Sequence, residues 1–191
     1  IGGNSKPLDV LTITQSGGVT FSDAINADTV TLTDTTGSVT FAGSTALETL
    51  NTASQDYNVI FNGSTNTFAD AVTFSNTGYV SFGNASGDSS TFDNGLTTAA
   101  PSEIRLAGTL QTSNDAMTVG TAVVLYANSI LNTGSAALTV GSTVDGGYTL
   151  TLNSTAATTF SGIVGGSTKL TGIITNSGGT VVFNTTAIST D

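Results

Sequence analysis

Four short stretches decide the fold of this chain: Val19-Thr-Phe21, Val39-Thr-Phe41, Val59-Ile-Phe61 and Val80-Ser-Phe82. Each begins and ends with an apolar residue, so an extended strand turns two side chains inward and one outward. The triplets recur at intervals of 20, 20 and 21 residues, and Ile104 and Val124 again differ by 20. Sequence periods of about 20 to 50 residues are typical of solenoids and arrays. We therefore predict that the triplets occupy equivalent places in successive coils.

The rest of the chain also consists of strand and turn signals. Strong helix formers are scarce, and short apolar runs such as Leu138-Thr-Val140 and Val181-Val-Phe183 alternate with turn clusters such as Ser16-Gly-Gly18 and Asn94-Gly95. We predict an all-β fold, a parallel β-solenoid (β-helix) of right-handed coil with rungs of about 20 residues. Residues 1–191 would form one repetitive β domain, either a fragment of a longer array or one protomer of a fibre. Roughly nine rungs at ~4.8 Å each would make a rod of about 40 to 45 Å.

An antiparallel β-sandwich or jelly roll is the alternative fold, because it also uses short strands at regular spacing. Its strands occupy different environments and do not need similar sequences. The near-identity of the triplets favours the solenoid.

Composition limits the classes of function. The chain is 38% hydrophobic but only 8% charged, and Thr, Ser, Asn and Gly supply about half of it. Thirteen acidic residues face three basic ones, Lys6, Arg105 and Lys169, for a formal net charge of −10. Three scattered cations cannot form a patch for phosphates, which argues against nucleic acid and anionic membranes as partners. The chain has no apolar run of the length that a membrane-spanning helix needs, so we predict no membrane insertion.

Catalytic chemistry has little material here. The chain has no histidine and no cysteine, which excludes triads that use either residue, and also thiolate metal sites and disulfides. A glycosidase would need two converging carboxylates beside aromatic residues, but the acids are dispersed and tryptophan is absent. We predict that the protein is not an enzyme and holds no organic cofactor.

Part of the sequence resembles a known class of repeats. The segments Gly141-Ser-Thr-Val-Asp-Gly-Gly-Tyr-Thr-Leu-Thr-Leu-Asn153 and Thr159-Phe-Ser-Gly-Ile-Val-Gly-Gly-Ser-Thr-Lys-Leu170, with earlier copies such as Phe68-Ala-Asp-Ala-Val-Thr-Phe74, resemble the β-strand repeats of large bacterial exoproteins. Those proteins include filamentous-haemagglutinin-like and autotransporter-like adhesins, and the resemblance covers about three quarters of the chain. It implies a secreted, cell-surface β-helical stalk from a bacterium that works in attachment, biofilm or sheath formation. It implies no catalytic residues.

Candidate sites for ligands are few. Asp88, Asp93 and Asp145 are the best candidates for calcium ligands, although Asp in a turn commonly binds its own backbone instead. The four tyrosines, Tyr57, Tyr79, Tyr126 and Tyr148, are expected at strand ends with outward hydroxyls, where they could also stack on a surface glycan as part of a carbohydrate-binding module.

Two further interactions are considered. Thr12-Ile-Thr14, Thr31-Leu-Thr33 and Thr149-Leu-Thr151 resemble the units of a threonine ice-binding array, but their spacings of 19 and 118 residues favour ordinary strand chemistry. Open rung ends, finally, predict self-association end to end or with neighbouring repeats.

Overall fold

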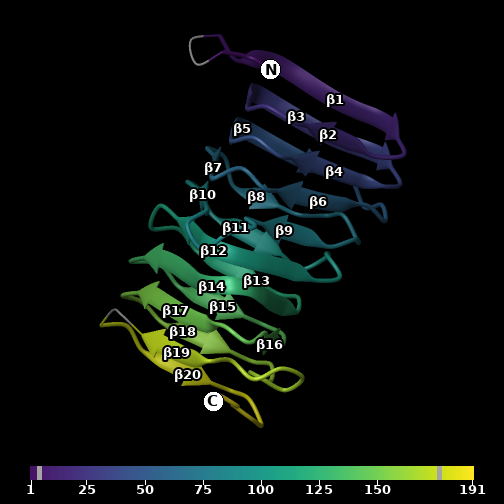
Figure 1. The fold of residues 1–191 in the computed structure, drawn as a ribbon. Helices are drawn as coiled ribbons and strands as arrows, with labels where there is room; N and C mark the ends of the chain where they lie inside the picture. The colour runs from purple at the N-terminus through teal and green to yellow at the C-terminus, as the bar shows by residue number, and fades with distance from the viewer. Residues whose placement is uncertain (4–5, 176–177) are drawn as a thin grey trace.

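The computed structural model describes residues 1–3, 6–175 and 178–191, and every regular element among them is a β-strand. The strands stack along one axis from β1 (Leu8–Ser16) at one end to β20 (Val181–Phe183) at the other (Figure 1). All pairings between the named strands are parallel. This confirms the predicted parallel β-solenoid and excludes the antiparallel sandwich.

The stack has three runs of strands, which we call faces A, B and C. β12 (Ile104–Thr112) and β14 (Val123–Gly134) are long strands that contribute their first halves to face B and their second halves to face A. The other strands of face A are β1, β3 (Ile25–Thr35), β5 (Thr45–Thr52), β7 (Thr65–Phe68), β10 (Ser89–Phe92), β17 (Thr149–Ser154) and β19 (Gly172–Thr175). Those of face B are β2 (Val19–Phe21), β4 (Ser38–Phe41), β6 (Asn58–Phe61), β9 (Val80–Phe82) and β16 (Val144–Asp145). Face C comprises β8 (Val72–Thr73), β11 (Leu96–Thr98), β13 (Met117–Val119), β15 (Leu138–Val140), β18 (Thr158–Phe160) and β20.

Face B carries the repeat that the sequence predicts. Its first inward row runs through Val19, Val39, Val59, Val80, Ile104, Val123, Val144, Val164 and Ile188. Two of the eight steps in this row take 24 residues, whereas the others take 19 to 21. The solenoid consequently has about eight turns, fewer than the nine that a uniform 20-residue period gives, and a length of about 40 Å at ~4.8 Å per turn.

The register also corrects one spacing. Ile104 lies opposite Val123 and not Val124, which pairs with Arg105. The reason is burial: Val123 is buried and Val124 is half exposed, and a slip of one residue would exchange the two. The right-handed sense of the coil stays a prediction.

Stacked phenylalanines fill the core next to this row. Phe21, Phe41, Phe61 and Phe82 lie in register on face B, with ring centroids 5.2, 5.0 and 5.9 Å apart in turn. Phe68 of face A meets the ring of Phe61 edge-on at 5.1 Å. Such offset and edge-on pairs add about 0.5–1.5 kcal/mol each beyond the burial of apolar area. The aromatic rows therefore hold the faces of the solenoid to one another.

The corners of the coil require small residues, since successive backbones pass within contact distance. A Cβ atom on Gly63 would lie 2.4 Å from the carbonyl oxygen of Gly43, one rung below. Any side chain there would push the rungs apart. This explains why glycine recurs at the same corner of neighbouring rungs.

Candidate functional site

A groove of about 260 Å³ opens on face B near the middle of the stack. It is lined by Ile60, Asn62, Tyr79, Ser81, Gly83, Asn84, Arg105 and Tyr126. Ile60, Ser81 and Arg105 are the outward residues of three successive triplets, on β6, β9 and β12. Tyr79 directly precedes β9, and Tyr126 lies on β14 one rung beyond Arg105. The parallel stack thus gathers side chains from four rungs into one surface feature.

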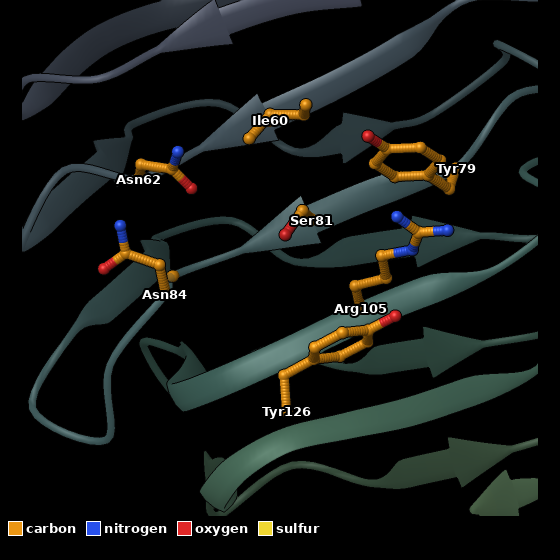
Figure 2. Close-up of a pocket in the computed structure, with 8 residues that line it drawn as sticks. Ile60, Asn62, Tyr79, Ser81, Asn84, Arg105 and Tyr126 are labelled. Carbon is orange, nitrogen blue, oxygen red and sulfur yellow. The ribbon is translucent and has the colours of Figure 1, made fainter. Parts of the chain in front are cut away.

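The hollow of the groove arises from Gly83. Its φ of +74° is unfavourable for residues with a side chain, and a Cβ atom would lie 2.2 Å from the carbonyl oxygen of Ala107. Neither Gly83 nor Ala107 can project far from the surface, so the floor stays low between higher walls. Asn62 and Asn84 form one wall, and Tyr79, Arg105 and Tyr126 form the other (Figure 2).

Arg105 is held rigidly in this wall. The Cζ atom of its guanidinium lies 3.7 Å from the centroid of the Tyr79 ring and 5.8 Å from that of Tyr126. Its Nε donates a hydrogen bond of 2.7 Å to Oε1 of Glu103. This bond raises the pKa of Arg105 above its ordinary value, so the guanidinium stays charged. A cation stacked on aromatic rings and tied to a carboxylate loses most of its freedom to move.

Several polar groups in the groove are free to bind a ligand. In the part of the chain that the structure describes, the Nη groups of Arg105 donate no hydrogen bond to protein, and neither do the side-chain amides of Asn62 and Asn84. The Tyr126 side chain is also open to solvent, with 54% of the residue exposed. The groove therefore offers one aromatic surface and a set of donors and acceptors with fixed positions.

Sequence reasoning placed two of these tyrosines on the surface but missed Arg105. The available signal was its position: it is the outward residue of Ile104-Arg-Leu106, where the other early triplets carry Thr20, Thr40, Ile60 or Ser81. A departure from the repeat at an exposed position needs no structural reason and marks a candidate site.

Tyr57 corrects the expectation of outward hydroxyls. It is 1% exposed, and its hydroxyl donates to the carbonyl of Leu32 at 3.3 Å and accepts from the backbone N–H of Ala53 at 3.0 Å. Burial raises the pKa of Tyr57 to about 12. The ring points inward because the loop before β6 needs partners for its backbone groups. Tyr148, by contrast, is 40% exposed, as expected.

The three calcium candidates lie apart and each accepts hydrogen bonds. Asp88 and Asp93 flank opposite ends of β10, and Asp145 lies on β16, two rungs further along. Oδ2 of Asp88 accepts from two backbone N–H groups of its own turn, at 2.8 and 3.0 Å. Oδ1 of Asp145 likewise accepts from two backbone N–H groups, and Asp93 accepts from the hydroxyl of Ser113. Among the described residues, no three His, Cys, Asp or Glu side chains converge as a metal site would require.

Face C carries a row of threonines that the sequence reasoning did not detect. Its members lie in register on five successive rungs and are Thr73, Thr97, Thr118, Thr139 and Thr159. Val182 follows on the sixth rung, and no strand of this face carries a charged residue. The three Thr-x-Thr units lie elsewhere, on face A. Thr12 and Thr31 do stack there, but Asn51 follows them and ends the row.

Comparison of the chain with family models, with curated proteins and with solved structures finds no match. The resemblance to adhesin repeats therefore stays a prediction. In the described residues, no helix meets the length and hydropathy needed to cross a membrane.

Proposed function

We propose that this protein is a segment of a rigid extracellular stalk or fibre, of the kind that bacterial surface adhesins use for attachment. The observation that carries the proposal is the unbroken in-register stack on face B, from Val19 to Ile188. Each rung contacts mainly its neighbours, so the length of such a rod grows with the number of rungs. A rod of this kind separates two points in space, which is the task of a stalk.

The distribution of exposed apolar side chains supports a role in assembly. Val10 in β1 is 58% exposed, and Ile174 in β19 and Ile188 are each 47% exposed. These residues lie on the terminal rungs, whose outer strand edges have unpaired backbone groups within the described structure. An unpaired parallel edge with apolar side chains readily accepts another strand. The partner in this proposal is a further rung, from the same chain or from another copy.

Electron microscopy of the protein at increasing concentration tests this function. We expect filaments with an axial spacing near ~4.8 Å. A variant that carries both Val10→Lys and Ile174→Lys places charge at the two open edges and should lose them. Thr118→Lys adds the same type of charge midway along the stack and serves as the control. Discrete particles at every concentration, or filaments that persist in the double variant, would refute assembly through the rung ends.

A further inference from the structure

We propose that the groove on face B is a binding subsite for a neutral glycan, taking a single sugar unit of a longer or branched chain. This inference goes beyond the stalk function and does not depend on it. It rests on the shape of the groove, its aromatic surface, its free polar groups and its charge, each of which limits the class of ligand.

The size of the groove matches a small ligand. Pockets for drug-sized molecules have about 300–1,000 Å³, whereas this groove has about 260 Å³ and is open along the surface. It cannot enclose a large cofactor. It can hold one sugar ring while the rest of the glycan extends along the face of the solenoid.

The walls provide the two kinds of contact that a sugar ring uses. Tyr126 offers an exposed aromatic ring for the apolar C–H face of a pyranose. The amides of Asn62 and Asn84 supply donors and acceptors, and the Nη groups of Arg105 supply further donors for sugar hydroxyls. Stacking on Tyr79 fixes the guanidinium before any ligand arrives. Binding then costs little side-chain entropy, which favours affinity in so small a site.

The charge of the site selects a neutral ligand. The positive charge of Arg105 is balanced by the carboxylate of Glu103 at 2.7 Å, and the whole chain carries a net charge of −10. A uronate or sialate would gain little from the paired guanidinium and would be repelled by Glu103 and by the protein as a whole. A neutral hexose or N-acetylhexosamine loses nothing to this field.

The groove is also a singular place in a repetitive surface. The equivalent outward residues on neighbouring rungs of face B are Thr20 and Thr40 before it and Val124 after it. None of these carries both charge and aromatic neighbours. The fold does not demand an arginine between two tyrosines at this rung, because the stack continues on both sides without one.

The test is a glycan array that carries neutral hexose and N-acetylhexosamine oligosaccharides beside uronate-, sialate- and sulfate-bearing ones. We expect binding to neutral members, and a Kd in the millimolar range for one free oligosaccharide by calorimetry. Tyr126→Ala should weaken this Kd at least 10-fold. Tyr148→Ala removes an exposed tyrosine outside the groove and should leave it unchanged.

A Glu103→Gln variant tests the charge argument. It leaves Arg105 without its neutralising partner, so binding of uronate-bearing members should rise relative to the parent protein. Failure of all neutral glycans to bind, binding to acidic glycans alone, or unchanged binding by Tyr126→Ala would overturn the proposal. Filament formation, measured separately by electron microscopy, would still stand or fall on its own, since Tyr126 lies far from the terminal rungs (Figure 1).

Discussion

Replacing Phe61 with alanine should destabilise the solenoid more than any truncation near its ends. Phe61 is fully buried and meets four rings: Phe41 at 5.0 Å, Phe68 at 5.1 Å, Phe82 at 5.9 Å and Phe74 at 6.3 Å. Truncating a buried phenylalanine costs about 3–5 kcal/mol, because apolar contacts are lost and a cavity remains. The loss of several ring pairs, at about 0.5–1.5 kcal/mol each, places Phe61→Ala at the upper end, about 5 kcal/mol. That is a third or more of the stability of an ordinary domain.

Two matched variants isolate the cause. Phe183 is half-buried in β20 and stacks on a single ring, that of Phe160 at 5.1 Å, so Phe183→Ala should cost only about 1–2 kcal/mol. Phe61→Leu should also cost only about 1–2 kcal/mol, because leucine already occupies the same row at Leu106.

Urea unfolding followed by far-UV circular dichroism gives the free energy of unfolding of each variant. A decrease in the m-value for Phe61→Ala would indicate that the two halves of the stack have uncoupled, as in other repeat proteins. If Phe61→Ala costs less than about 2 kcal/mol, or no more than Phe183→Ala, the aromatic row does not hold the faces together and the argument is wrong.

Three further predictions concern a corner, a buried hydroxyl and a turn. Gly63→Ala should lower the thermal midpoint, since its Cβ would lie 2.4 Å from a carbonyl oxygen, whereas Gly87→Ala, with no atom within 4 Å, should shift it little; equal shifts would contradict the close approach of rungs. Because the pKa of Tyr57 is raised to about 12, the unfolded chain releases this proton near pH 10 while the folded chain keeps it. The free energy of unfolding should therefore fall by roughly 2–3 kcal/mol between pH 10 and 12, and Tyr57→Phe, measured over the same range, should lose that part of the slope. Asp88→Ala removes the acceptor of two backbone N–H groups and should cost about 1–3 kcal/mol equally in calcium and in EDTA, and a loss confined to calcium would instead identify an ion site.

Much of the fold could be predicted from the sequence because a parallel stack repeats one environment. The triplets at Val19, Val39, Val59 and Val80 occupy equivalent positions, so each has to meet the same demand for two inward apolar side chains. The match between their spacing and the observed register follows directly. Regularity failed at Ile104, where a step of 24 residues is followed by one of 19.

The candidate groove could be predicted only in part. Tyr79 and Tyr126 are 47 positions apart, and Arg105 lies between them in sequence without any local motif. Their convergence depends on register across three rungs, which a change of one residue in loop length would destroy. The repeat does offer a signal, because Arg105 occupies an outward position that is small or uncharged on the preceding rungs.

The sequence by itself determined the class of fold, the period of the coil and the identity of the inward rows, because these depend on alternation and recurrence along the chain. Only the tertiary structure decided which residues share an outward row. The threonine row of face C, the buried hydroxyl of Tyr57 and the stacking of Arg105 on Tyr79 all arise between rungs 20 or more residues apart. The physical reason is that turn lengths differ from rung to rung, and each difference shifts which side chains become neighbours on the surface.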